Sequence, residues 1–292
     1  MLLRGKNALV IGGSGALGPS LIEELIGLGC TVTWTSRAAE TPRSQHLKLD
    51  LLNRVEIVSV LESRDFDLIF NLAADLGTNL DSSLNVNVLG LNNLLSVCLD
   101  KGDKARIVLI GSAAEYGHID PLDNPVSEDH ALSPVSVYGL TKVWQTQLAL
   151  HYSDRLQIVV ARMFNLDAPN LKESLFLGKL DKQIAEFKEG LLSEIQTGPL
   201  DAVRDYIDVQ MAATQICAIG ALGEAGQAYH VASGSPISMY ELLCKRFEQA
   251  NLDLKYHRTS ASQGSTRSSG VSKIYADITR TSALVCELYG SK

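Results

Sequence analysis

A tyrosine and a lysine four residues apart, in SVYGLTK (136–142), are the residue pair in this chain best suited to chemistry. The pattern around them predicts a helix over about 138–153, and at this spacing Tyr138 and Lys142 project from one helix face. An ammonium beside a phenol favours the phenolate, so we expect the pKa of Tyr138 to fall below its usual value of about 10. Tyr138 would then act as an acid or base between a carbinol and a carbonyl.

A serine is placed to join this pair. Ser112 ends a strongly apolar stretch, RIVLI (106–110), that predicts a strand over 106–112. Ligands of open α/β sheets bind just outside the carboxyl ends of the strands. We therefore predict Ser112, Tyr138 and Lys142 as the catalytic set, with Ala113 bordering the substrate. Glu115 is interpreted as an ordinary surface or cap carboxylate, because a one-residue shift along an extended or turning segment redirects a side chain.

The glycine-rich stretch GGSGALG (12–18) lies between a first predicted strand, 7–13, and a first predicted helix, 16–28. Glycines at this point allow a tight turn and a close backbone approach to a diphosphate at the helix N-terminus. The turn therefore predicts a dinucleotide site. Its residues are Gly12, Gly15, Ala16, Leu17 and Gly18.

The second predicted strand ends in Thr35-Ser36-Arg37. An acidic residue here typically holds the ribose 2′-hydroxyl of NAD, whereas a serine and an arginine suit a 2′-phosphate. Ser36 and Arg37 therefore favour NADP(H) as cofactor, with NAD(H) still possible. Arg37 is equally compatible with a solvated surface arginine.

The elements that must position these residues alternate along the first half of the chain. Continuous apolar strands separated by helices indicate a parallel sheet covered on both faces, and hence an α/β fold of the Rossmann type with a doubly wound parallel sheet. The predicted strands are 7–13, 31–37, 67–74, 106–112 and 157–165; the predicted helices are 16–28, 51–63, 82–100 and 138–153. After residue 166 this rhythm stops.

We therefore predict two parts. A cofactor-binding Rossmann domain comprises 1–166 and about 209–232. A smaller, discontinuous C-terminal substrate-binding domain comprises 167–208 and 233–292. The serine-rich segment 258–270 is expected to be a mobile loop, since its composition cannot build a core.

Composition narrows the class of protein. The chain has 292 residues, 46% hydrophobic and 20% charged, with a net charge of −7. This acidic balance argues against nucleic acid as the main partner, and the absence of an apolar run of about 18 residues argues against a membrane span. Five scattered cysteines without metal-ligand spacing predict buried, reduced thiols in a cytoplasmic protein and no metal site.

Taken together, these motifs resemble the extended short-chain dehydrogenase/reductases of the nucleotide-sugar epimerase/dehydratase family. The resemblance covers about 250 residues. The matching pieces are GGSGALG, Asp50-Leu51, NLAA (71–74), Asn87, Ser112, YGLTK, ARMFNLDAP (161–169), RDYIDV (204–209) and HVASGSPISMYELL (230–243). Helix 174–190 and the DAVRDYIDV segment look most like GDP-mannose 4,6-dehydratases and GDP-4-keto-6-deoxy-mannose reductases.

The resemblance implies roles for individual residues. Tyr138 would exchange the proton at the sugar carbonyl, Lys142 would also hold the nicotinamide ribose, and Ser112 would bind the reacting oxygen. The implied cofactor contacts are Asp50, Leu51, Leu72, Ala73, Ala74 and Asn87. The implied contacts to a nucleotide-diphosphate sugar are Asn165, Lys179 and Arg204. Arg204 is also compatible with an ion pair to Asp201 or Asp205. A homodimer is also implied, through apolar positions on 92–99 and 144–150, which are equally compatible with core residues that face the sheet.

In this family a 4,6-dehydratase carries an acid two positions after its hydroxyl residue, and here that position is Ala114. Ser112, Tyr138 and Lys142 suffice for hydride transfer to a ketone. The first prediction is therefore reduction of a 4-keto-6-deoxy nucleotide sugar, GDP-linked by preference. A nucleotide-sugar 4-epimerase, a 4,6-dehydratase and a non-catalytic NAD(P)-binding regulator remain as alternatives.

Overall fold

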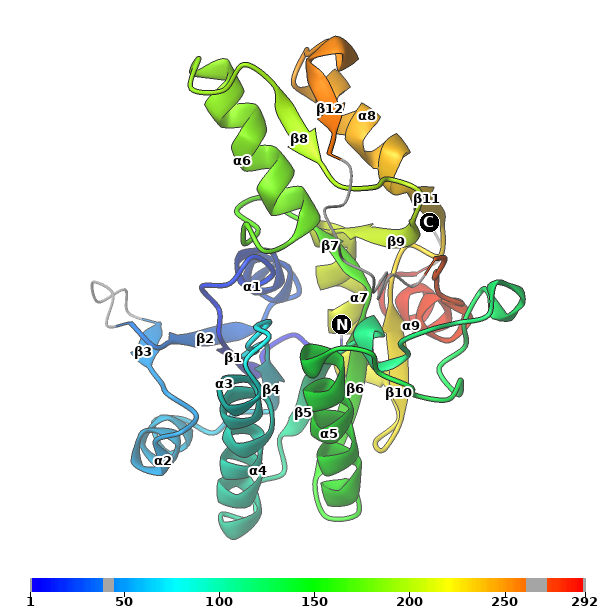
Figure 1. Ribbon diagram of the computed structural model, residues 1–292. Helices are drawn as coiled ribbons and strands as arrows, with labels where there is room; N and C mark the ends of the chain where they lie inside the picture. Colours follow the sequence, from blue (N-terminus) through cyan, green and yellow to red (C-terminus); the bar gives the residue numbers. More distant parts are fainter. Residues whose placement is uncertain (1, 39–44, 261–271, 291–292) are drawn as a thin grey trace.

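A seven-stranded parallel sheet forms the centre of the computed structural model (Figure 1), which describes residues 2–38, 45–260 and 272–290. The strand order is β10-β6-β5-β4-β1-β2-β3, and each neighbouring pair is parallel. This confirms the predicted Rossmann-type α/β fold. The strands are β1 (Asn7–Ile11), β2 (Thr31–Ser36), β3 (His46–Lys48), β4 (Leu68–Asn71), β5 (Arg106–Ser112), β6 (Gln157–Met163) and β10 (Ala228–Val231).

Helices cover both faces of this sheet. On one face, α1 (Gly18–Gly27) and α7 (Val209–Leu222) contribute to an apolar core that receives Ala8 and Val10 of β1. On the other face, α2 (Arg54–Glu62), α4 (Gly90–Asp100) and α5 (Val137–Tyr152) pack over Leu9 and Ile11. Successive residues of one strand thus enter opposite cores, which is why the strand sequences are continuously apolar.

The long helix predicted over 82–100 is wrong in one respect, because it is not one regular helix. It consists of α3 (Leu80–Leu84), a π-helical turn over Asn85–Leu89, and α4. Such π turns often occur at functional sites. This one places Asn87 fully inside the molecule, although Asn85 and Leu89 remain exposed.

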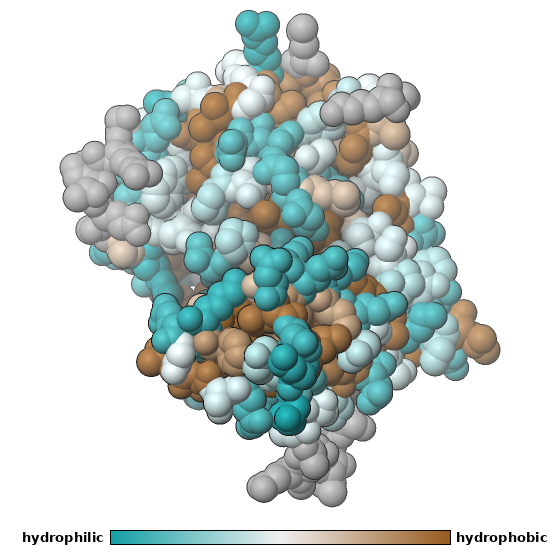
Figure 2. Space-filling view, turned by 90° about the horizontal axis from the view of Figure 1, so that it is seen from above, coloured by the Kyte–Doolittle hydropathy of each residue, from teal (hydrophilic) through white to brown (hydrophobic). Residues whose placement is uncertain are grey.

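A second part lies beyond the carboxyl ends of the strands, at the top of Figure 1. Its own core combines Leu180, Ile184, Ile195, Leu243 and Phe247. Seen from above, hydrophilic and apolar residues alternate over its visible surface (Figure 2). Its elements are α6 (Phe176–Lys188), β8 (Ile195–Thr197), α8 (Met239–Gln249) and β12 (His257–Thr259), with the linking sheet β11 (Pro236–Ser238), β9 (Val203–Asp208) and β7 (Asn165–Asp167).

The last helix, α9 (Thr279–Tyr289), returns to the central sheet and packs beside α7 (Figure 1). Its Leu284 and Leu288 join the core of the α1 and α7 face. The sequence partition assigned 233–292 to the smaller part, whereas α9, which lies within that range, packs on the central sheet instead. Of the predicted serine-rich loop, 258 and 259 belong to β12 and 261–270 lie outside the described residues.

The cysteines differ from the prediction that all are buried. Cys30, Cys98 and Cys217 are buried, whereas Cys244 is half-buried and Cys286 is exposed. The exposed thiol follows from the position of α9, whose outer face is in solvent. Among the described residues, the structure contains no helix with the length and apolar character needed to cross a membrane.

Candidate active site

The predicted motifs meet at one edge of the sheet, because the carboxyl ends of parallel strands all point the same way. The glycine-rich turn after β1 contacts the segment after β4: a Cβ atom added to Gly12 would lie 3.1 Å from the Ala73 amide nitrogen. Gly12 has a φ of +79°, a region that favours glycine. The amides of Gly12 and Gly13 donate to the Thr35 carbonyl at the end of β2. Three strand ends are therefore joined at this turn.

The glycine-rich turn fits a dinucleotide diphosphate. A Cβ atom on Gly18 would lie 2.1 Å from the Gly13 carbonyl oxygen, so this position requires glycine for the turn to close onto α1. Gly15 is different: a Cβ atom there would meet only the Gly12 carbonyl oxygen, at 3.4 Å, and would otherwise occupy open space above the start of α1. Ala16 is half-buried and Leu17 is in the core, so their backbones are what they offer a ligand.

The end of β2 carries polar side chains. Arg37 is exposed, and the hydroxyl of Ser36 hydrogen-bonds the Ala38 carbonyl and His46 Nε2, at 3.0 and 2.9 Å. His46 was not among the predicted site residues, because β3 is only three residues long. Leu51 is buried, and the Asp50 carboxylate accepts from the Leu52 amide at 2.9 Å.

Asn87, a predicted cofactor contact, is buried and hydrogen-bonds two segments of the site. Its Nδ2 donates to the Asp75 carbonyl and to Thr141 Oγ1, both at 3.0 Å, and its Oδ1 accepts from the Asp75 amide. These bonds use the whole amide group. Asn87 therefore ties the segment after β4, which includes the half-buried Leu72, Ala73 and Ala74, to the helix that carries Tyr138.

Ser112, Tyr138 and Lys142 come together between β5 and α5. The Ser112 hydroxyl lies near enough to the Tyr138 phenol to lower the pKa of that phenol. Lys142 is 1% exposed, and its ammonium donates to the Ile110 carbonyl and to Gln145 Oε1. The structure thus brings the three residues predicted to be catalytic together at the end of β5 and the start of α5.

The predicted lowering of the tyrosine pKa is wrong for this arrangement. Burial raises the pKa of Tyr138 to about 12, against the nearby Ser112 hydroxyl, which lowers it. Burial also lowers the pKa of Lys142 to about 8. The lysine points to the carbonyl of Ile110 instead of the phenol, so the spacing of the two residues on the helix did not translate into a phenol–ammonium contact. The phenol is consequently held in its protonated form.

The position of Glu115 corrects part of the sequence interpretation. It is a cap carboxylate, as expected, but it is fully buried instead of lying on the surface. It ends the short 3₁₀ turn Ala113–Glu115, accepts from the Ser112 amide at 2.7 Å, and forms an ion pair with Arg162 at 3.1 Å. A buried carboxylate needs such a partner. Arg162 lies 47 positions after Glu115 in the sequence. An arginine within the apolar run VVARM was the available sign that a buried carboxylate pairs with it.

The predicted substrate residues lie on the linking sheet and on α6. Asn165 Nδ2 donates to the Asp205 carbonyl at 2.9 Å. Arg204 is half-buried, and burial lowers the pKa of its guanidinium. In the part of the chain that the structure describes, no ion pair joins Arg204 to Asp201 or Asp205, since Asp205 instead accepts from Ser233 and Gly234. Ala113 is half-buried beside Ser112, and Lys179 is exposed on α6.

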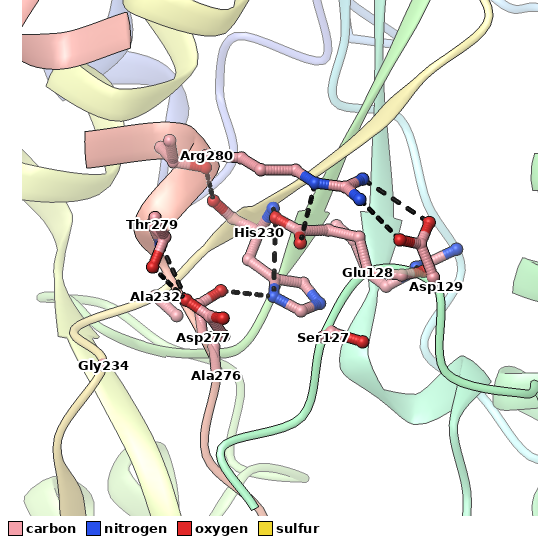
Figure 3. A network of polar contacts seen from close by, with 12 residues as sticks. Ser127, Glu128, Asp129, His230, Ala232, Gly234, Ala276, Asp277, Thr279 and Arg280 are labelled. Atoms are coloured by element: carbon pink, nitrogen blue, oxygen red, sulfur yellow. Dashed lines mark hydrogen bonds and ion pairs between the residues drawn. The ribbon is translucent and has the colours of Figure 1, made fainter. Parts of the chain in front are cut away.

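A second polar network, which sequence reasoning did not find, extends from Arg162 to α9. Figure 3 shows its part around His230 and Arg280. Arg162 donates to the Tyr116 hydroxyl, which hydrogen-bonds His230 Nε2 at 2.5 Å. His230 Nδ1 donates to the Asp277 carbonyl, and Arg280 pairs with Glu128 and Asp129. These residues come from four segments that are distant in the sequence, so no local motif predicts the network.

Comparison with known proteins places these features in a family. The model of the NAD dependent epimerase/dehydratase family matches residues 8–232. GDP-6-deoxy-D-mannose reductase of Pseudomonas aeruginosa is 30% identical over 176 residues, which are 59% of this chain and 58% of that protein. dTDP-6-deoxy-L-talose 4-dehydrogenase (NAD(P)(+)) of Kitasatospora kifunensis is 24% identical over 263 residues, 87% of this chain and 82% of that protein.

Solved structures share the fold over nearly the whole chain. RMD from Pseudomonas aeruginosa complexed with NADPH gives a TM-score of 0.82 at 24% identity and covers 96% of this chain and 92% of that one. MoeE5 in complex with UDP-glucuronic acid and NAD gives 0.80 at 25% identity, with the same two coverages. With the glycine-rich turn, the strand order and the family match in agreement, this chain belongs to the NAD dependent epimerase/dehydratase family.

Proposed function

We propose that this chain is a reductase that converts the 4-keto group of a 4-keto-6-deoxy nucleotide-diphosphate sugar into an alcohol with NADPH. The observation that carries the proposal is the position two residues after Ser112. It holds Ala114, where a dehydratase of this family would need an acid, and the nearby Glu115 carboxylate is buried and engaged with Arg162. The site retains a hydroxyl, a phenol and a lysine, which suit carbonyl reduction.

The state of Tyr138 supports reduction. Its phenol is protonated at neutral pH, so it is ready to donate a proton to a keto oxygen. Ser112, which lies near that phenol and lowers its pKa, would hold the same oxygen. Lys142 is a buried lysine that would hold the nicotinamide ribose of a bound cofactor. Bound NADPH supplies the hydride; the hydride and the Tyr138 proton together turn the ketone into a secondary alcohol.

Different residues support the choice of cofactor and the choice of sugar-nucleotide substrate. Ser36 and Arg37 at the end of β2 favour a 2′-phosphate, and hence NADPH over NADH. Arg204 offers a half-buried cation to a diphosphate, which suits a sugar nucleotide. A GDP-linked substrate is favoured by the similarity to the Pseudomonas aeruginosa reductase, whose matched stretch spans 58% of that protein.

The test is a direct assay. Purified protein is mixed with NADPH and, in turn, the GDP-, dTDP-, UDP- and CDP-linked 4-keto-6-deoxy sugars, and the loss of nicotinamide absorbance is followed. We expect oxidation with at least the GDP-linked ketone. The Tyr138→Phe variant is expected to lose about 10²–10⁴-fold in kcat, the usual contribution of a general acid, with little change in the KM for NADPH.

Each other outcome identifies a different function. No oxidation with any of the four ketones contradicts the reductase. Release of a 4-keto product from GDP-mannose without added cofactor indicates a 4,6-dehydratase. Interconversion of 4-epimers without net change of nicotinamide indicates a 4-epimerase. Tight NADPH binding without turnover of any of these substrates indicates a regulator.

A further inference from the structure

We propose that Glu115 is a positioning residue for the reduction: its buried carboxylate fixes the backbone of Ser112 and joins the strands and the helix that carry the reacting residues. This inference rests on the proposed function, because it assigns a role in the same site. It also goes beyond the sequence interpretation of Glu115 as an ordinary surface or cap carboxylate.

The carboxylate contacts three elements at once. Oε1 accepts from the Ser112 amide at the end of β5, at 2.7 Å, and from Thr146 Oγ1 of α5, at 3.1 Å. Oε2 accepts from Arg162 Nε of β6, at 3.1 Å. Thr146 lies one helical turn beyond Lys142, on the helix that also carries Tyr138. One side chain therefore sets the position of β5 relative to both α5 and β6.

The Ser112 side chain is fixed by the same turn. Its Oγ accepts from the Ala114 amide at 3.2 Å, and its amide donates to Glu115, so the two form a reciprocal capping box. Gly111 leaves room for the carboxylate, because a Cβ atom at this position would lie 2.8 Å from Glu115 Oε1. Losing the carboxylate would free the Ser112 amide and loosen the segment that aims its hydroxyl.

The same geometry removes Glu115 from direct chemistry. Its side chain is 0% exposed, and its two oxygens accept three hydrogen bonds. A carboxylate in this position has no path to a sugar in the cleft, so it cannot take a proton from the substrate. Its influence is exerted through Ser112 and through its charge.

The charge of Glu115 acts on both titrating residues of the site. The charged and titratable groups that face it are Arg162 of β6, Tyr116 directly after the turn, and Tyr138 and Lys142 of α5. The carboxylate raises the pKa of Lys142, against burial, and it also raises the pKa of Tyr138. Both effects favour the protonated forms that carbonyl reduction uses.

Three variants test the proposal in the full-length protein. Glu115→Gln retains an oxygen for the Ser112 amide but removes the charge. Glu115→Asp retains the charge but shortens the reach to Ser112. Glu128→Gln is the matched control, because Glu128 is also buried and lies beside Arg280, in the network that continues towards α9.

The kinetic outcome separates positioning from general stability. For both Glu115 variants we expect kcat to fall about 10–100-fold, as small misplacements of reacting groups typically cost, with little change in the KM for NADPH. The alkaline limb of the kcat/KM profile should move to lower pH only in Glu115→Gln, because only that variant loses the charge. Equal kcat and an equal pH profile in Glu115→Gln and wild type would overturn the proposal.

A readout without turnover distinguishes failure of this inference from failure of the reductase assignment. The titration of Lys142 is followed by NMR on protein labelled with ¹³C-lysine, its signal being assigned from the Lys142→Arg variant. The midpoint should fall in Glu115→Gln and remain in Glu115→Asp and Glu128→Gln. If wild type reduces no ketone, the proposed function fails; an unchanged midpoint in Glu115→Gln contradicts the role of Glu115 whatever the substrate is.

Discussion

At the scale of single residues, we predict that Arg37 selects the cofactor. It is exposed at the end of β2, beside Ser36. A charge-assisted hydrogen bond contributes about 1.5–3 kcal/mol, so we predict that Arg37→Ser raises the KM for NADPH about tenfold or more and leaves the KM for NADH unchanged. Steady-state kinetics with both nucleotides checks this. Arg64→Ser, an exposed arginine that precedes β4, is the control; a parallel loss with NADH would contradict a 2′-phosphate contact.

His230 is a buried residue whose ionisation should affect stability. Its Nδ1 donates to the Asp277 carbonyl, so its Nε2 is the nitrogen that accepts from the Tyr116 hydroxyl, and the ring is neutral. Burial lowers the pKa of His230 to about 4 from the ordinary 6.5. His230 therefore binds a proton below about pH 6.5 in the unfolded chain, but only below about pH 4 in the folded protein.

This difference has a definite sign. A group whose pKa is lowered in the folded state contributes stability above its unfolded value and loses it as the pH falls. We predict that the free energy of unfolding of wild type falls between pH 6.5 and 4 by on the order of 3 kcal/mol more than that of His230→Gln. Urea unfolding across this range measures it. The exposed His118→Gln should follow wild type; parallel curves for wild type and His230→Gln would contradict the prediction.

At the scale of elements, the contact between α5 and the turn after β5 depends on Gly139. A Cβ atom there would lie 2.4 Å from the Ala114 carbonyl oxygen, so α5 has to approach this carbonyl through a glycine. We predict that Gly139→Ala pushes the start of α5 away, lowers stability by about 1–3 kcal/mol, and reduces kcat at least tenfold by separating Tyr138 from Ser112.

The control is a glycine without neighbours. A Cβ atom on Gly27, at the end of α1, would meet nothing within 4 Å, so Gly27→Ala is expected to leave kcat unchanged and to match or exceed wild-type stability. Thermal melts and kinetics of the two variants are compared. Wild-type kcat in Gly139→Ala would show that this close approach is not needed for activity.

The elements also show which features a sequence can predict. Strand and helix alternation, the glycine-rich turn and the Ser112–Tyr138–Lys142 set follow from local patterns, and the fold class is confirmed. The burial of Glu115 was not predictable, because it depends on Arg162 arriving on a neighbouring strand. The predicted lowering of the Tyr138 pKa was also wrong, because burial raises it and Lys142 donates to the Ile110 carbonyl instead of the phenol. The spacing of two residues on a helix predicts neither effect.

At the scale of the whole molecule, α4 and α5 stand side by side on one face of the sheet (Figure 1). Trp144 of α5 is 40% exposed and Leu89, in the π turn before α4, is 45% exposed. Exposed large apolar residues on adjacent helices suit an interface with a second copy. We therefore predict a homodimer across this face.

Sedimentation velocity tests the dimer. Wild type is expected at twice the chain mass, and Trp144→Glu at the mass of one chain, with an unchanged circular dichroism spectrum. Leu122→Glu, an exposed apolar residue on the loop before α5, is the matched control and should remain dimeric. A monomeric wild type, or a dimeric Trp144→Glu variant, would contradict the assignment of this face.

The parallel pairing of β10 with β6 also has a consequence for synthesis of the chain. β6 is complete at Met163, but its outer neighbour, β10, runs from Ala228 to Val231. During translation β6 therefore remains an open sheet edge while the whole intervening segment is made, and open edges invite pairing with other chains. His230 arrives with that closing strand, so the buried network around Tyr116 is completed only then. A nascent chain halted before Ala228 would hold Ser112, Tyr138 and Lys142 on an unfinished and aggregation-prone sheet.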